Sequence, residues 1–419
     1  MTDSINSLLK PFQRFGINLG LTRIERLLKD LGNPHHTVPI IHVAGTNGKG
    51  SVCAYLASIL SSAGYKVGRY TSPHLVDWTE RINLKGQAIA ERELIQVLQE
   101  VTEKAKLATE TPTQFEIITA AAWLYFAQQK VDVAVMEVGL GGRLDATNVC
   151  DRPLASIIVS LSREHWQRLG PTVADIAREK AGVLKADCPA IIGQLPEDAE
   201  AVVTAKIAEL NCPATWVEPA KVTRNEGKMR WVKSGELEYP LPLLGEMQLT
   251  NSAIAIATIQ NLRQQGWKIT DSAIIEGMKQ TTWAGRMQWY RWQERDILID
   301  GAHNPAAAQY LRKYVDSLEQ PVTWLMGMLS TKDHKDVFQA LLRPGDRVYL
   351  VPVPDHSSAN PQELADLALK VCPQLAECQT QPDLLSAFAH LNQEYPQEQI
   401  IFCGSLYLIG YFFKHHQQN

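Results

Sequence analysis

The chain has 419 residues, of which 45% are hydrophobic and 21% are charged, with a formal net charge of −4. This composition is typical of a soluble globular protein and excludes a largely disordered chain. The charge balance does not favour a nucleic acid or a membrane surface as a partner, and no apolar segment approaches the length of a transmembrane helix. Because the length exceeds that of one ordinary hydrophobic core, we expect two domains.

The first residues, MTDSINSLLKPFQRFG, carry an acidic residue early and contain no long apolar run, so we do not expect a secretory signal. The seven cysteines are scattered, odd in number and never arranged as C-x-x-C. This pattern predicts reduced thiols in a cytoplasmic protein and favours neither a disulfide framework nor a zinc site.

Strands and helices are expected to alternate through the first part of the chain, after an amphipathic helix that ends at Gly32. The predicted strands cover residues 39–44, 66–74, 131–138, 154–162 and 189–193, and the predicted helices cover 51–64, 91–108, 115–129 and 174–184. The strands lack polar alternation, which indicates burial on both faces of a parallel sheet. We therefore predict an α/β fold whose N-terminal domain is a P-loop NTPase-like, doubly wound, mostly parallel sheet.

Residues 214–245 differ from this pattern. Short half-polar strands are expected over 214–222, 228–234 and 237–243, which predicts a small antiparallel flap before helices at 251–266 and 271–280. A strand–turn–helix unit then restarts near residue 297. We expect a first domain over 1–285, a hinge over 286–296 and a smaller C-terminal Rossmann-like α/β domain over 297–419.

The stretch GTNGKGS at residues 45–51 lies between a predicted strand and a predicted helix. It differs from the usual phosphate loop, G-x-x-x-x-G-K-[ST], because Gly50 separates Lys49 from Ser51. Backbone N–H groups of such a loop and the helix N-terminus bind phosphate, while Lys49 would neutralise phosphate charge and Ser51 is a candidate metal ligand. The alternative is an ordinary glycine-rich turn with a solvent-facing lysine.

Two further clusters are expected where strands of the first domain end. Glu137 ends a buried strand at the carboxyl edge of the sheet, where it could hold the magnesium of a nucleotide or simply accept loop N–H groups. Glu164 and His165 follow the next strand, although a lone histidine is more often structural. Lys180 lies on the following helix and by default would be solvated and paired with an acidic neighbour, Asp175 or Glu179.

The second domain carries a fourth cluster. Asp300 and His303 follow a predicted strand in LIDGAHNP, and Arg286 lies in the proposed hinge. Arg286 could reach a triphosphate bound to the first domain, or could be an exposed linker residue.

Taken in order, these motifs resemble one family. The motifs are VAGTNGKGS, YTSPHL, TERI, EVGLGGRLDATN, His165, REKAG, AGRMQ, DGAHNP and GSLYLIG. They are similar to those of bacterial folylpolyglutamate synthase, often also dihydrofolate synthase, within the ATP-dependent Mur-type ligases. The resemblance runs from about residue 14 to about residue 410. In this family the loop is written G-T-N-G-K-G-[ST], so the glycine after the lysine is a family trait.

The resemblance implies an amide synthesis in which ATP phosphorylates a carboxylate of dihydropteroate or of a folate, and L-glutamate then attacks the acyl phosphate. Two Mg²⁺ ions would offset the charge of the phosphates and the substrate carboxylate. The expected partners are these small molecules, with the chain acting as a monomer. Alternatives are a Mur ligase of cell-wall synthesis, a P-loop kinase or NTPase, and a non-catalytic nucleotide-binding protein.

The resemblance also implies roles for individual residues. The nucleotide contacts would be Thr46, Asn47, Gly48, Lys49, Gly50, Ser51, Asn251, Arg286, Asp300 and His303. The metal ligands would be Ser51, Ser72, Glu137, His165 and an N-carboxylated Lys180, and the catalytic group Lys49, Glu137, His165 and Lys180. The pterin side would be lined by Asn18, Leu19, Gly20, Thr113, Phe115, Leu144, Asp145 and Ala146. Two features depart from the family: Glu164 stands where aspartate is usual, and the loop over 355–364 has an unusual sequence.

Overall fold

The computed structural model describes residues 2–15, 18–227, 229–395 and 398–416. Lys228, at the start of the second strand predicted for the flap, lies outside these ranges. The chain forms two compact units, Met1–Pro242 with Gln248–Thr282 and Leu243–Met247 with Trp283–Asn419. Each unit is described by itself below.

The first unit is built on an eight-stranded sheet with the order β4-β3-β2-β5-β1-β6-β7-β8. Its strands are β1 Ile40–Ala44, β2 Val67–Tyr70, β3 Ile82–Leu84, β4 Gln87–Ala88, β5 Val133–Glu137, β6 Ala155–Ile158, β7 Ala190–Ile192 and β8 Ala214–Trp216. All neighbours pair in parallel except β3, which is antiparallel to β2 and to β4. Every residue of β1, β5 and β6 is buried, which confirms the prediction of a parallel-dominated α/β fold.

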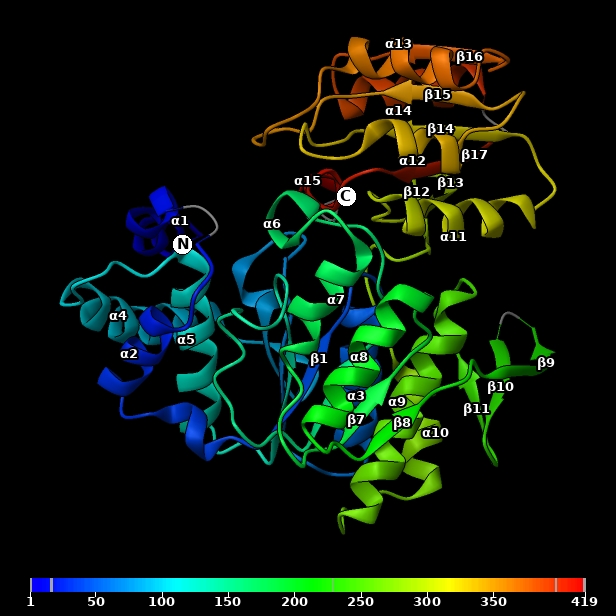
Figure 1. Ribbon diagram of the computed structural model, residues 1–419. Coiled ribbons are helices and arrows are strands. Elements are labelled where there is room, and N and C mark those ends of the chain that lie inside the picture. Colours follow the sequence, from blue (N-terminus) through cyan, green and yellow to red (C-terminus); the bar gives the residue numbers. More distant parts are fainter. Residues whose placement is uncertain (1, 16–17, 228, 396–397, 417–419) are drawn as a thin grey trace. The chain divides into compact units, whose positions relative to one another are not determined.

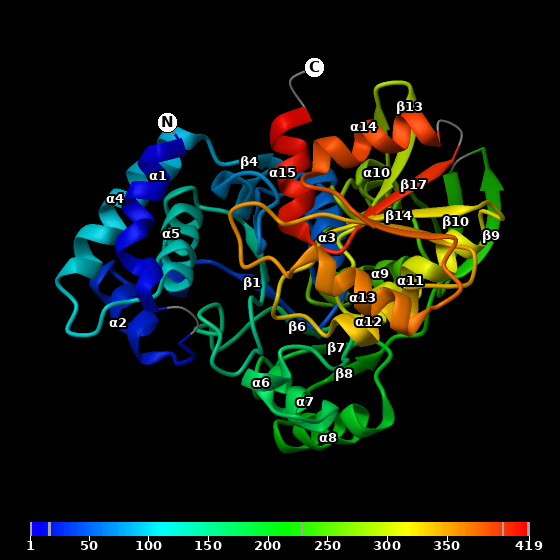
Figure 2. The same ribbon diagram turned by 90° about the horizontal axis from the view of Figure 1, so that it is seen from above.

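Helices cover both faces of this sheet. The first unit contains α1 Thr2–Leu9, η1 Lys10–Phe15, α2 Thr22–Asp30, η2 Pro34–Thr37, α3 Lys49–Ser62, η3 Trp78–Arg81, α4 Glu91–Lys106, α5 Gln114–Gln128, α6 Trp166–Leu169, α7 Val173–Ala181, α8 Glu197–Glu209, α9 Met247–Gln264 and α10 Asp271–Gln280. Figure 2 shows α5, α7 and α8 on one face and α3, α9 and α10 on the other, as expected for a doubly wound sheet.

The antiparallel flap is smaller than predicted. It consists of β9 Lys221–Glu226, β10 Met229–Ser234 and β11 Leu237–Leu241, which lie together at one side of the first unit in Figure 1. The prediction that residues 214–216 belong to it is wrong, because β8 pairs in parallel with β7. Helix α8 supplies the crossover between these two strands, and a three-residue edge strand is too short to show a burial pattern in the sequence.

The second unit has a six-stranded sheet with the order β12-β13-β17-β14-β15-β16. Its strands are β12 Gln288–Trp292, β13 Arg295–Ile299, β14 Val322–Met326, β15 Arg347–Leu350, β16 Glu377–Thr380 and β17 Gln399–Cys403. Its helices are α11 Pro305–Asp316, α12 His334–Leu341, α13 Pro361–Val371, α14 Leu384–Glu394 and α15 Leu406–His416. Only β12 is antiparallel to its neighbour, so the second unit is also α/β.

The segment 286–296 is folded as part of the second unit. β12 pairs with β13 from Gln288–Ile299 to Trp292–Arg295, and Gln293 adopts a positive φ of 51° in the two-residue turn between them. The expected hinge is therefore a β-hairpin, because Trp289, Tyr290 and Trp292 favour a strand over a linker. β16 was not predicted, since its half-polar, partly exposed sequence gives no apolar signal.

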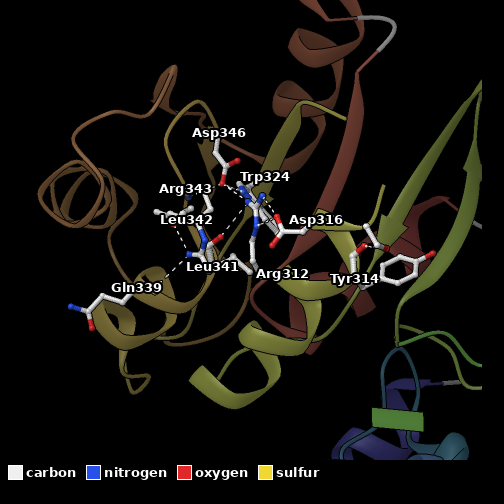
Figure 3. A network of polar contacts seen from close by, with 10 residues as sticks. Arg312, Tyr314, Asp316, Trp324, Gln339, Leu341, Leu342, Arg343 and Asp346 are labelled. Carbon is white, nitrogen blue, oxygen red and sulfur yellow. Dashed lines mark hydrogen bonds and ion pairs between the residues drawn. The ribbon is translucent and has the colours of Figure 1, made fainter. Parts of the chain in front are cut away.

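A buried ion network fastens helix α11 to the rest of the second unit (Figure 3). The Arg312 guanidinium donates to Asp346 Oδ2 at 2.6 Å and to Asp316 Oδ1 at 2.7 Å. Asp346 Oδ2 also accepts the Trp324 indole N–H at 2.9 Å. Each buried charge thus faces an opposite charge or a hydrogen-bond donor.

All seven cysteines are free thiols. Within the described ranges, no helix combines the length and the apolar character that crossing a membrane requires.

Candidate functional site

The phosphate-loop sequence connects β1 to α3. Gly48 adopts a left-handed φ of 85° immediately before α3 begins at Lys49. A Cβ at Gly48 would lie 2.4 Å from Asn251 Oδ1 and 2.9 Å from Val159 Cγ1, so both the backbone conformation and the available space require glycine. The first N–H groups of α3 have no partner inside the helix and lie at its positive end, an arrangement that favours the binding of an anion.

The segment after β6 holds the loop in place. Thr46 N donates to Ser160 O at 2.7 Å, and Asn47 N donates to Ser160 Oγ at 3.1 Å. The Thr46 hydroxyl donates to Ser162 O at 3.2 Å. Thr46 and Asn47 therefore use their backbone N–H groups within the protein, which leaves the first turn of α3 as the main donor set for a phosphate.

Two lysines converge on one carbonyl oxygen beneath this loop. Lys49 Nζ donates to Gly45 O at 3.0 Å and to Thr46 O at 3.1 Å, and Lys180 Nζ donates to Gly45 O at 2.8 Å. Lys180 is 5% exposed, and burial, together with the charge of Lys49, lowers its pKa to about 7. Glu164 and Asp145 oppose this shift.

The default interpretation of Lys180 as a solvated, paired side chain is wrong. Its two expected partners bind other residues: Asp175 pairs with Arg178 at 2.5 Å, and Glu179 pairs with Arg143 at 2.8 Å. Lys180 therefore lies on the inner side of α7, facing the phosphate loop.

Glu137 ends β5 and is buried at 5% exposure. Its Oε2 accepts the backbone N–H of Ser72 at 3.0 Å, so the two residues expected at the first metal are adjacent. The same bond also fits the alternative of a carboxylate that accepts a loop N–H. Whether Glu137 binds a metal or only accepts the loop N–H, this bond to Oε2 orients its carboxylate.

His165 lies at the N-terminus of α6 with a left-handed φ of 50°. Its side chain is 41% exposed, and Nε2 lies 3.7 Å from Glu164 Oε1. His165 is thus at the rim of the site rather than in its buried part. Among the residues that the structure describes, no group of three or more His, Cys, Asp or Glu side chains could hold a metal. A cation here would need hydroxyl, phosphate or carbamate oxygens as well.

Two side-chain amides on α9, those of Gln248 and Asn251, form hydrogen bonds beside the phosphate loop. Asn251 Nδ2 donates to Gln248 Oε1 at 3.1 Å, and Gln248 Nε2 donates to Ser51 Oγ at 3.3 Å. Tyr55 OH also donates to Gln248 Oε1, at 3.3 Å. Gln248 was not predicted, although its i,i+3 spacing from Asn251 on one helix face was a signal in the sequence.

The residues expected at the pterin side come from three distant segments that lie together. Gly20 N donates to Leu144 O at 3.3 Å, and Arg23 Nη2 donates to Asn18 O at 2.5 Å. Arg23 also pairs with Glu116 at 3.1 Å, whose carboxylate accepts the Thr113 N–H at 2.6 Å in the capping box of α5. Arg23 and Glu116 thus connect predicted residues but were themselves missed, because their contacts span over 90 positions.

Asp145 and Phe115 have clear packing roles. Asp145 Oδ1 accepts the N–H and the hydroxyl of Thr147 at 3.0 and 2.6 Å, and Oδ2 accepts Leu140 N at 2.8 Å. Asp145 therefore braces the turn that presents Leu144 and Ala146, and burial raises its pKa. The Phe115 ring covers Gly139, where a Cβ would lie 2.4 Å from Cζ. Leu19 is half-buried.

In the second unit, three predicted residues gather beyond the end of β13. Asp300 Oδ2 accepts Met287 N and Oδ1 accepts Ala302 N, both at 2.8 Å. His303 Nδ1 lies 2.7 Å from Gly301 O, and a Cβ at Gly301 would lie 2.2 Å from Arg286 Nη1. Arg286 therefore passes directly over Gly301. Burial raises the pKa of Asp300, while the charge of Arg286 opposes this shift.

A groove of about 490 Å³ lies between α7 and α8 and contains none of the predicted residues. Its charged rim residues are Arg143, Arg178, Lys206 and Glu209, each held in an ion pair. The groove is therefore not the predicted nucleotide site.

The sequence matches two family models. Residues 43–259 match the Mur ligase middle domain, and residues 287–415 match the C-terminal domain of dihydrofolate synthetase. The chain is similar to a probable dihydrofolate synthetase of Schizosaccharomyces pombe, with 35% identity over 95% of this chain and 98% of the relative.

Solved structures agree with this similarity. One is Escherichia coli FolC in complex with DHPP and ADP, with 29% identity, a TM-score of 0.86, and coverage of 99% of this chain and 97% of that one. Another is a bifunctional folylpolyglutamate synthase/dihydrofolate synthase with Mn, AMPPNP and L-glutamate bound, with 30% identity, a TM-score of 0.85, and coverage of 98% and 97%.

Proposed function

Since the chain belongs to the folylpolyglutamate synthase and dihydrofolate synthase family of Mur-type ligases, we propose that it adds L-glutamate to dihydropteroate, to the terminal glutamate of a reduced folate, or to both. The enzyme is an ATP-dependent ligase that joins an acid to an amino acid. A cell-wall ligase is not supported beyond the shared superfamily, because the relatives named above act in folate metabolism.

The phosphate loop supports ATP as the phosphoryl donor. We propose that the first turn of α3 binds the β- and γ-phosphates and that Lys49 turns from Gly45 O and Thr46 O to the transferred phosphate. A carboxylate is a poor acyl donor because oxide would have to leave. Phosphorylation supplies phosphate as the leaving group, and the glutamate amine then attacks the acyl carbon. Lys49 stabilises the negative charge that develops during transfer.

Magnesium fits the oxygen donors at the loop. The Ser51 hydroxyl and the Glu137 carboxylate are hard oxygen ligands, and Mg²⁺ prefers such ligands together with phosphate and water. We propose that Ser72 and Glu137 serve one ion and that Glu137 and His165 serve a second, with Ser51 close by. The ions would offset repulsion between the phosphates and the substrate carboxylate.

Lys180 fits an N-carboxylated role. A pKa of about 7 leaves a large fraction of the amine unprotonated at neutral pH, and an unprotonated amine combines with carbon dioxide to give a carbamate and a proton. Carboxylation would replace a buried cation beside Lys49 with an anionic oxygen ligand.

We assign the acyl substrate to the cluster that joins residues 18–20, 113–116 and 144–146. Backbone hydrogen bonds and the Arg23–Glu116 ion pair hold these three segments together. Phe115 offers a ring face for a pterin. Asn251, beside the phosphate loop, is assigned to the nucleotide. The nucleotide contacts that the resemblance implies for Arg286, Asp300 and His303 stay predictions. We further propose that the enzyme is a cytoplasmic monomer, which light scattering and cell fractionation would check.

The convergence of Lys49 and Lys180 on Gly45 O, at the base of a phosphate loop, carries this proposal. The test is ADP release from ATP and Mg²⁺ with L-glutamate and either dihydropteroate or tetrahydrofolate. We expect release only when both the acid and glutamate are present. Release without glutamate would indicate a kinase or NTPase, and release with UDP-muramoyl peptides but not with folates would indicate a cell-wall ligase.

A further inference from the structure

Gln248 lies at the centre of a buried hydrogen-bond network beside the phosphate loop. It is 2% exposed, and its side-chain amide contacts three residues on two helices: Ser51 and Tyr55 on α3 and Asn251 on α9. It touches neither Lys49 nor the strand ends in any contact described above. Its neighbours, rather than Gln248 itself, are the residues assigned to metal and nucleotide.

The network has a defined direction. Gln248 Oε1 accepts both the Tyr55 hydroxyl proton and an Asn251 amide proton, so Nε2 must face Ser51. Because Asn251 donates with Nδ2, its Oδ1 is directed to Gly48, where a Cβ would lie 2.4 Å away. A reversed Gln248 amide would turn a donor toward Asn251 and rotate the Asn251 oxygen away from the loop.

The same amide sets the Ser51 hydroxyl. Accepting the Gln248 N–H uses one lone pair of Ser51 Oγ and fixes the side-chain rotamer. The second lone pair of Ser51 Oγ then points in one fixed direction, where a cation could bind it. One glutamine thus orients two oxygens beside the phosphate loop, Ser51 Oγ and Asn251 Oδ1.

We propose that Gln248 is a positioning residue that orients Ser51 and Asn251 for the magnesium–nucleotide complex. The inference rests on the proposed function in so far as that function assigns nucleotide binding to this loop. Its test is direct binding of ADP, with and without Mg²⁺, which does not depend on the folate substrate.

The variant is Gln248→Met, which keeps the length of the side chain and removes its hydrogen bonds. We expect about tenfold weaker binding of ADP with Mg²⁺ and a smaller loss, about threefold, for ADP in EDTA, because the Ser51 orientation matters only to the metal. The matched control is Tyr239→Phe, which removes a buried hydrogen bond of 3.1 Å to Ser252 on the same helix. We expect the control to bind ADP within twofold of the wild type while losing a similar amount of thermal stability.

Double-mutant cycles separate positioning from general destabilisation. In EDTA, Gln248→Met added to Asn251→Ala should weaken ADP binding no further than Asn251→Ala alone, because the contact through Asn251 is then already lost. If Gln248→Met does not fold, the cycle of Ser51→Ala with Asn251→Ala tests the same bridge, and non-additive losses are expected.

Additive losses, equal losses with and without Mg²⁺, or Mg–ADP binding within twofold of the wild type in Gln248→Met would overturn the proposal. If wild-type enzyme binds Mg–ADP but releases none from ATP with any folate, the proposed function fails while the role of Gln248 is still decided by the binding data.

Discussion

Two of the buried clusters of charge, one in each unit, differ in how the charge is balanced. In the second unit, Arg312 has carboxylates on two sides, Asp316 and Asp346, at 2.7 and 2.6 Å. In the first unit, Lys180 is buried with a second cation, Lys49, and both donate to the same neutral carbonyl oxygen, Gly45 O.

The pKa values of Arg312 and Lys180 shift in opposite directions, in line with this difference in charge balance. Burial alone would lower the pKa of Arg312, but its bonds to Asp316 and the charge of Asp346 raise it. For Lys180, burial and Lys49 act together and lower the pKa to about 7. A buried charge that is paired with opposite charges typically has a structural role. A buried charge without such pairing indicates a functional site, where an anion binds or the charged group is modified.

The largest effect is expected from removing the unbalanced cation. Lys180→Ala should lower the rate of glutamate-dependent ADP release by about 100-fold or more, because a group acting on the transition-state charge is lost. Short carboxylates such as acetate should restore part of the rate by replacing the carbamate. Arg178→Ala is the control on the same helix and should keep the rate within twofold, because the Arg178 side chain is 63% exposed and pairs with Asp175. No rescue, together with an unmodified lysine by mass spectrometry and ¹³C-bicarbonate NMR, would refute the carbamate.

Removing the balanced cation should affect stability instead. Arg312→Ala leaves Asp346 buried without its cation and should lower the free energy of unfolding by about 3–5 kcal/mol. Urea denaturation measures this effect, and ADP affinity should change less than twofold. Arg291→Ala removes an ion pair of 3.1 Å whose side chains are 60% and 63% exposed, so it should cost less than about 1 kcal/mol. Equal losses in the two variants would show that the network in Figure 3 contributes no more than a surface pair.

The pH dependence of stability gives a third contrast. Above a folded pKa of about 7 and below the unfolded value of about 10.5, the unfolded state binds more protons at Lys180 than the folded state. Wild-type stability should therefore rise with pH in this window relative to Lys180→Met, by about 2 kcal/mol between pH 7 and pH 9. The free-energy cost of burying protonated Lys180 is fully present below pH 7, where Lys180→Met should be the more stable protein. Urea denaturation at several pH values in carbon-dioxide-free buffer measures the difference, and parallel stability curves for the two proteins would contradict the low pKa.

These contrasts also explain what the sequence could predict. Unbroken apolar runs such as β1 and β5 identified the parallel sheet. The ends of the strands led to the predictions at Lys49, Glu137 and the loop before His165. The edge strands β8 and β16 were misassigned or missed because short strands that are exposed, as β8 is, or partly exposed, as β16 is, have no periodic signal.

Residues that act through tertiary contacts were harder to predict. Gln248 and Arg23 lie in helices with no motif of their own, and Glu116 belongs only to a capping box. Their long-range partners are up to 197 positions away. The inward direction of Lys180 was equally hidden, since acidic neighbours at 175 and 179 made a surface pair the simpler expectation. Motif order thus predicts which strand ends meet, while side-chain direction depends on packing.

The smallest expected effect concerns Glu164, which stands where the family usually has aspartate. Its charge raises the pKa of Lys180 against the stronger effect of burial. Glu164→Gln should therefore lower the pKa of Lys180 further. The readout is the difference in stability between the Glu164→Gln protein and the Glu164→Gln/Lys180→Met double variant, followed against pH. The pH at which this difference begins to change should be lower than in the wild-type background by less than about one pH unit. Glu179→Gln is the control, because Glu179 pairs with Arg143 and does not contribute to the pKa shift of Lys180. An upward move of this pH in Glu164→Gln, or an equal move in both variants, would mean that Glu164 does not face the buried amine and that its substitution for aspartate is neutral at this site.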